Sequence, residues 1–139
     1  MYIENEAKKI IEKYHTNDPY ALCDAMGIQV GFANIGSLRG VFHVIRRNAF
    51  ITIHCDLCDT EKRACCAHEL GHAVLHKEQN RFFLNSSLYS TGRFEREADE
   101  FGAFILWHDY QLENFEGLSL EQIKMETGIP LRCLSLILK

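Results

Sequence analysis

The stretch His68-Glu69-Leu70-Gly71-His72 decides how the rest of this chain is interpreted. It lies in a segment, residues 60–76, whose apolar residues recur at helical spacing. Residues four apart on a helix lie one turn apart on the same face, so the imidazoles of His68 and His72 can both reach one metal ion. Glu69 can reach the open position of that metal and hydrogen-bond a water there. The stretch is therefore typical of a zinc hydrolase, with two ligands and a general base close together.

The helix that carries this motif is expected to be largely buried. Its apolar positions form a wide surface made of Ala64, Ala67, Leu70, Gly71, Val74 and Leu75. Polar groups on a buried helix need partners, because unpaired ones are costly. A metal ion supplies such a partner, which disfavours the alternative of histidines on a solvent-exposed helix face.

A third ligand must come from elsewhere, because a catalytic zinc normally takes three protein ligands and keeps one position for water. Apolar spacing predicts a second long helix over residues 93–108. Glu95 on this helix can supply a carboxylate oxygen, and Asp99 can accept a hydrogen bond from the outer nitrogen of a ligand histidine. Glu97 is the rival ligand, pointing roughly 200° away from Glu95 around the helix. We favour Glu95, although the helical wheel does not decide between the two.

His76 extends the row of histidines by one further turn. In a longer zinc motif, a glycine breaks the helix after the second histidine so that a third can return to the metal. No such break lies between His72 and His76, and His76 is rotated by roughly 80° from His68 around the helix. Packing against a loop or at the rim of the site is therefore favoured over ligation.

The remaining pattern predicts an α+β domain spanning residues 1–139, because a chain of 139 residues with 47% hydrophobic residues can build one core. Besides the two central helices, we expect helices over 3–15, 19–26, 119–127 and 130–138, and strands over 28–32, 41–45 and 50–54. The last two strands are expected to form a hairpin, and residues 79–92 a polar loop. Asp59 or Thr60 is the expected cap of the motif helix, and Ser119 that of the next-to-last helix.

Composition argues against several classes of partner. The net charge is −4 and no basic cluster is present, which makes nucleic acid an unlikely ligand. The last two helices, within 118–139, form a helical hairpin that is expected to pack on the core, since its second helix offers only Arg132 and Lys139 for DNA. No apolar run is long enough to span a bilayer, and residues 1–12 contain no signal-peptide core, so we expect a cytoplasmic protein. The six cysteines are expected to be reduced and packed as small apolar residues.

The two central segments resemble the ImmA/IrrE family of metalloendopeptidases. The resemblance is carried by HELGHAVLH at residues 68–76 and EREADEFGA at residues 95–103. It implies a zincin-like fold, a zinc cofactor held by His68, His72 and Glu95, and Glu69 as catalytic base. Members are commonly encoded by phages and integrative elements, and some cleave the helix-turn-helix repressor of the element. One departure is visible, because residues 105–109 replace the family's usual Leu-Met-Pro-like stretch.

We therefore expect a zinc-dependent endopeptidase that acts on a cytoplasmic protein, such as a phage or mobile-element helix-turn-helix repressor. The alternative is a non-proteolytic regulatory or toxin–antitoxin-like binding protein that retains the metal site. Glu69 favours catalysis, because a protein that only binds has no need of a general base.

Overall fold

The computed structural model describes residues 2–76 and 92–138, and in that part of the chain it contains six α-helices and three strands. The helices are α1 (Tyr2–Tyr14), α2 (Pro19–Ala25), α3 (Asp59–Leu75), α5 (Gly92–Trp107), α6 (Leu120–Thr127) and α7 (Leu131–Ile137). The strands are β1 (Ile28–Ala33), β2 (Gly40–Ile45) and β3 (Asn48–His54), and a short 3-10 helix, η2, covers Leu112–Phe115. The predicted α+β class is confirmed, whereas nearly all of the expected loop over 79–92 lies outside the described residues.

The sheet is mixed, with strand order β1-β3-β2. Strand β2 pairs antiparallel with β3, so the expected hairpin is present, while β1 pairs parallel with β3. The hairpin turn is made by Arg46 and Arg47, both in the left-handed region with φ of 50° and 70°. Two such residues in succession match the primed turns that suit the right-handed twist of a tight hairpin.

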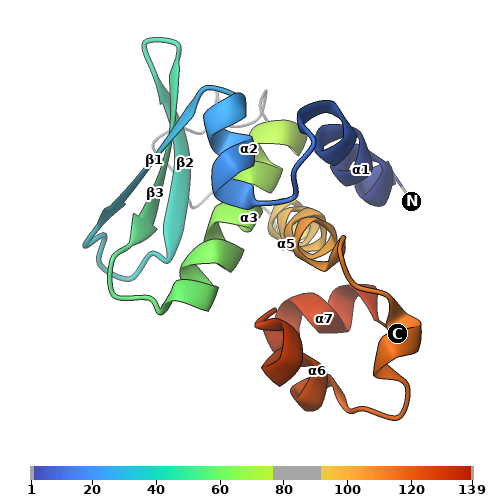
Figure 1. The fold of residues 1–139 in the computed structure, drawn as a ribbon. Helices are drawn as coiled ribbons and strands as arrows, with labels where there is room; N and C mark the ends of the chain where they lie inside the picture. Colours follow the sequence, from blue (N-terminus) through green and yellow to red (C-terminus); the bar gives the residue numbers. More distant parts are fainter. Residues whose placement is uncertain (1, 77–91, 139) are drawn as a thin grey trace.

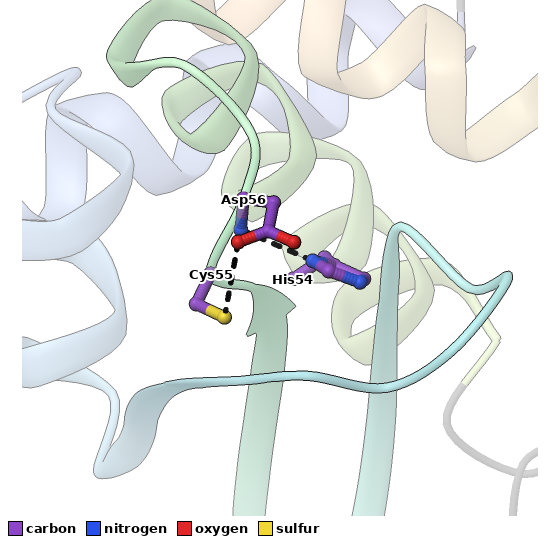
Figure 2. Close-up of side chains that lie close together, drawn as sticks. All are labelled: His54, Cys55 and Asp56. Atoms are coloured by element: carbon purple, nitrogen blue, oxygen red, sulfur yellow. Dashed lines mark hydrogen bonds between the residues drawn. The ribbon is translucent and has the colours of Figure 1, made fainter.

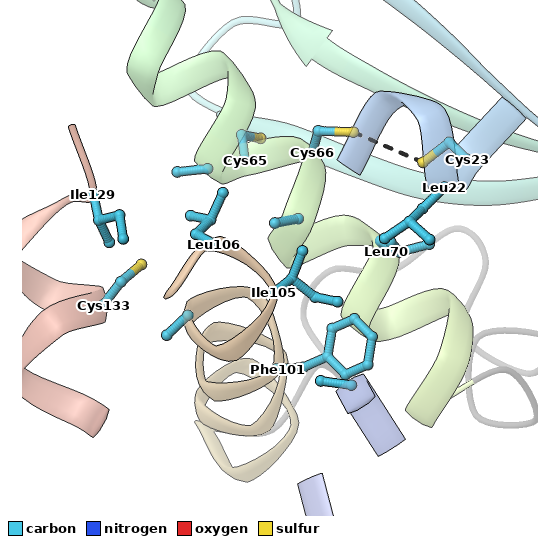
Figure 3. Packing of buried hydrophobic residues seen from close by; sticks show 14 of the residues in the cluster. Leu22, Cys23, Cys65, Cys66, Leu70, Phe101, Ile105, Leu106, Ile129 and Cys133 are labelled. Carbon is cyan, nitrogen blue, oxygen red and sulfur yellow. Dashed lines mark hydrogen bonds between the residues drawn. The ribbon is translucent and has the colours of Figure 1, made fainter. Parts of the chain in front are cut away.

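Helices α2 and α3 lie against the sheet, and α1 and α5 lie beyond them (Figure 1). The middle strand contributes the fully buried side chains Ile51 and Ile53, and α3 contributes Leu70. On the other side of α3, Phe101 and Ile105 of α5 are fully buried (Figure 3). Helix α3 therefore runs through the interior, as its apolar surface predicts.

Helices α3 and α5 approach each other closely because each carries a glycine at the contact. A Cβ atom at Gly71 would lie 3.0 Å from the backbone of Ala98, and one at Gly102 would lie 3.1 Å from the backbone nitrogen of His68. Any larger residue would push the helices apart. This close packing brings the polar side chains of the two helices within reach of each other.

Local signals explain most helix ends. Ser119 and Gln122 form the expected capping box at the start of α6, and Gly128 closes that helix in the left-handed conformation. The expected cap of α3 is wrong: Cys58 occupies the capping position without a side-chain hydrogen bond, and Asp59 already lies within the helix. Asp59 and Glu61 instead place negative charge in the first turn, where the helix dipole favours it.

Helix α7 packs on α5 and α6 packs on α7, at the end of the molecule away from the sheet (Figure 1). Cys133 and Leu134 of α7 are buried in the same hydrophobic cluster that contains Ile3 of α1. Arg132 also forms an ion pair with Glu61 at the start of α3. No helix among the described residues is long and apolar enough to cross a membrane.

The cysteines divide into two groups. Four are buried as expected, and the Sγ atoms of Cys23 and Cys66 lie 3.7 Å apart in the core (Figure 3). Cys55 and Cys58 are exposed, so the expectation that all six pack in the interior is wrong for these two. Both follow β3 in the connection to α3, where the chain runs over the surface.

Candidate metal centre

Three side chains from α3 and α5 converge at one point. The ligand atoms of His68, His72 and Glu95 all lie within 4.8 Å of one another. Oε1 of Glu95 lies 3.2 Å from Nε2 of His68, and Oε2 lies 2.7 Å from Nε2 of His72. The structure therefore brings together the three residues from which the sequence predicted a metal site.

This donor set fits a zinc ion. Two ligand atoms at roughly 2.0–2.1 Å from a tetrahedral zinc lie about 3.3 Å from each other. The observed separations are 3.2 and 2.7 Å, measured to the two different oxygens of Glu95, so the three side chains lie near enough to share one ion. Two imidazole nitrogens and one carboxylate oxygen are also a common ligand set for a catalytic zinc, which leaves a fourth position for water.

Asp99 lies one turn along α5 from Glu95 and contacts the outer side of His68. Its Oδ1 atom lies 2.7 Å from Nδ1 of His68. Burial alone lowers the pKa of His68, but the hydrogen bonds with Asp99 and Glu95 outweigh it and raise the pKa to about 10. Without a metal, the ring is thus a cation held between two carboxylates. A metal cation would replace the proton of this ring and supply the positive charge in its place.

Glu69 is buried beside this group, with Oε2 lying 3.8 Å from Nε2 of His68. Burial raises the pKa of its carboxyl group, while the nearby histidines and the backbone amide of Phe42 act in the opposite direction. A carboxyl group with a raised pKa is a better proton acceptor at neutral pH than an ordinary exposed one. Glu69 is therefore a buried carboxyl group with a raised pKa, close to His68.

Strand β2 forms one wall beside Glu69, a contribution that the sequence analysis missed. A Cβ atom at Gly40 would lie 3.3 Å from Cγ of Glu69 and would collide with Sγ of Cys65. Phe42 supplies the backbone amide noted above. The glycine itself was the available signal, but only the packing of β2 against α3 shows which side chain it accommodates.

The rival carboxylate, Glu97, does not join the three converging groups. Its Oε1 atom lies 2.8 Å from Nε2 of His76, whose Nδ1 atom lies 3.0 Å from Nδ1 of His72. His76 is only 3% exposed, so it packs inside the protein rather than at an open rim. Glu95 and Glu97 therefore face different histidines of α3.

A second group of potential ligands, His54, Cys55 and Asp56, lies in the connection after β3 (Figure 2). Nδ1 of His54 accepts a hydrogen bond from the backbone nitrogen of Asp56 at 3.1 Å, so this ring nitrogen already has a partner. Cys55 and Asp56 are exposed and contact each other at 3.7 Å. The group on α3 and α5 is the better metal site, because it is more enclosed and has both Nε2 atoms directed toward a carboxylate.

Comparisons with known proteins agree with this geometry. The family described as the IrrE N-terminal-like domain, Peptidase_M78, matches residues 23–122. The chain is 31% identical over 132 residues to the uncharacterized immunity region protein 2 of Bacillus phage phi105, covering 92% of this chain and 84% of the relative. It is 27% identical over 133 residues to metallopeptidase ImmA of Bacillus subtilis (strain 168), covering 92% of this chain and 79% of the relative.

Proposed function

Because the chain belongs to the ImmA/IrrE family of metallopeptidases, we propose that it is a zinc-dependent endopeptidase. The observation that carries this proposal is the placement of buried Glu69 beside the converging ligand atoms of His68, His72 and Glu95. A protein that used the metal only for stability would need no buried carboxyl group next to the open coordination position.

His68, His72 and Glu95 are the proposed ligands, and Asp99 holds His68 through Nδ1. A zinc ion bound by these groups supplies Lewis-acid activation of water and of a peptide carbonyl. Glu69 accepts the proton of the attacking water and later delivers it to the departing amine.

The proposed substrate is a cytoplasmic protein, namely a helix-turn-helix repressor of the phage or mobile element that encodes the chain. Two observations support this. The family resemblance implies such substrates for some members, and the relative in phage phi105 is named as an immunity region protein. The same comparison supports a place for the chain in the regulation of a mobile element.

The test is Glu69→Gln in the zinc-loaded chain, co-expressed with the repressor encoded beside its gene. We expect the variant to keep its zinc, since Glu69 is not a proposed ligand, and to lose cleavage of the repressor. Glu121→Gln, an exposed substitution on α6, is the matched control and should cleave normally.

Two other outcomes would contradict the proposal. Cleavage by Glu69→Gln at the normal rate would remove Glu69 from the role of base. A zinc-loaded, unsubstituted chain that binds the repressor and leaves it intact would favour the alternative, a regulatory binding protein that retains the metal site.

A further inference from the structure

The ring of His72 is held at both of its nitrogen atoms. Nε2 lies 2.7 Å from Glu95, and Nδ1 lies 3.0 Å from Nδ1 of His76. The other ring nitrogen of His76 lies 2.8 Å from Oε1 of Glu97. We propose that His76 and Glu97 are positioning residues, which orient His72 so that its Nε2 atom offers a lone pair to the metal. This inference rests on the proposed zinc site.

Only one placement of the ring hydrogens along His72, His76 and Glu97 is consistent with a metal-bound His72. A neutral histidine that binds a metal through Nε2 carries its hydrogen on Nδ1. His72 therefore donates to Nδ1 of His76, which accepts with its lone pair. His76 then carries its own hydrogen on Nε2 and donates it to Glu97, whose carboxylate has only acceptors. Each contact has one donor and one acceptor.

The other proposed histidine ligand, His68, has a similar arrangement, but its ring contacts a carboxylate directly. Nε2 of His68 faces Glu95 at 3.2 Å, and Nδ1 faces the carboxylate of Asp99 at 2.7 Å. For His72, the imidazole of His76 is inserted between ring and carboxylate. Both rings are thus anchored from behind by a carboxylate of α5, a pattern that fixes ring orientation and increases the basicity of metal-bound histidines.

Neighbouring side chains hold His76 and Glu97 in place. The ring of Phe94 packs 4.6 Å from the ring of His76, centroid to centroid, and His76 is 3% exposed. Nε of Arg93 donates to Oε2 of Glu97 at 3.4 Å, which leaves Oε1 for His76. A buried nitrogen that loses its partner is energetically costly, so Glu97 has a strong effect on the orientation of His76.

Ligation by His76 itself is the competing explanation. Among the described residues, neither group whose ligand atoms lie within 4.8 Å of one another contains His76. Both nitrogens of His76 are also engaged with His72 and Glu97. The geometry therefore indicates that His76 orients the ligand His72 and does not bind the metal itself.

The first experiment measures the affinity of the full chain for zinc ion alone, by competition with a chromophoric chelator. We expect Glu97→Ala to weaken zinc binding roughly 10–100-fold, the usual effect of removing a partner that orients a metal ligand. Arg96→Ala is the matched control, because Arg96 is an exposed residue of the same helix, next to Glu97 in the chain. It should bind zinc within about twofold of the unsubstituted chain, a margin far below the effect of losing an orienting partner.

The second experiment determines which ring nitrogen of His72 carries the hydrogen, by NMR of the zinc-loaded chain labelled with nitrogen-15 at histidine. We expect a hydrogen on Nδ1 of His72 that exchanges slowly with water, and rapid exchange of it in Glu97→Ala. Glu97→Gln keeps an oxygen that can accept from His76, so it should restore part of the affinity and slow the exchange again. It also serves as the test variant if Glu97→Ala fails to fold.

The outcomes separate this inference from the proposed function. Normal zinc affinity in both Glu97 variants, or a metal-bound His72 with its hydrogen on Nε2, would overturn the role of His76 and Glu97 while leaving the zinc site intact. Failure of the unsubstituted chain to bind zinc would overturn the proposed function and this inference together.

Discussion

Glu95 and His72 come from different helices, and their Oε2 and Nε2 atoms lie 2.7 Å apart. The distance depends on how closely α3 and α5 approach, because each residue points from its own helix into the space between the two. Gly71 and Gly102 set that approach, since each faces the backbone of the other helix where a methyl group would press against it. The site is therefore sensitive to the spacing of two helices as well as to its own side chains.

The first prediction concerns this spacing. Gly71→Ala places a Cβ 3.0 Å from the backbone of Ala98. Overpacking of this kind costs about 1–3 kcal/mol, whereas the gain in helix propensity is about 1 kcal/mol. We expect a net loss of stability, measured by urea unfolding, together with weaker zinc binding. Gly31→Ala on β1 is the control, because nothing lies within 4 Å of its Cβ position. A Gly71→Ala chain that is more stable and binds zinc normally would contradict this account.

The second prediction distinguishes the two groups of potential ligands. Elemental analysis of the purified chain should find about one zinc per molecule, as expected for a single three-ligand catalytic site. His72→Ala should lose it, because two remaining ligands hold zinc poorly. His54→Ala removes a histidine from the exposed group after β3 and should retain the metal. Zinc that persists in His72→Ala and disappears in His54→Ala would place the metal at the connection after β3.

The third prediction concerns the pH dependence of zinc binding. The pKa of His68 is about 10 in the metal-free protein, so zinc must displace a proton from this ring at neutral pH. The apparent affinity should therefore rise with pH between pH 6.5 and 9, measured by chelator competition. Asp99→Asn removes the hydrogen bond that most strongly raises this pKa and should make the rise shallower. An affinity independent of pH over this range would contradict the charged state of His68.

The fourth prediction concerns the stability of the metal-free chain. The folded-state pKa of His68, about 10, is above the ordinary histidine value of 6.5, so the charged ring stabilises the fold fully below pH 6.5. This contribution should be lost progressively as the pH rises from 6.5 toward 10. Urea unfolding in the presence of a chelator should show lower stability at pH 9 than at pH 6, and a smaller difference in Asp99→Asn. Equal pH dependence in both chains would exclude His68 as its source.

Local sequence patterns predicted much of the fold. Apolar spacing located α1, α3 and α5 to within a few residues, because one face of each is buried. Capping residues, prolines and glycines located α2, α6 and α7. The capping box of Ser119 and Gln122 and the hairpin of β2 and β3 depend on neighbours in the chain, and both are present. The prediction of the α3 cap was wrong because Asp59 is as suitable inside the first turn of the helix as it is before that turn.

Helical spacing was enough to place His68, Glu69 and His72 together on one buried helix, since the geometry of a helix relates residues four apart without reference to the rest of the chain. The packing of the elements in space was needed to show that Glu95 faces the two histidines while Glu97 faces His76. It was also needed to show that Gly40 and Phe42 of β2 border Glu69. Those relationships depend on the rotation and separation of elements far apart in the chain. Such quantities are set by the packing of the whole core, and no local spacing of residues encodes them.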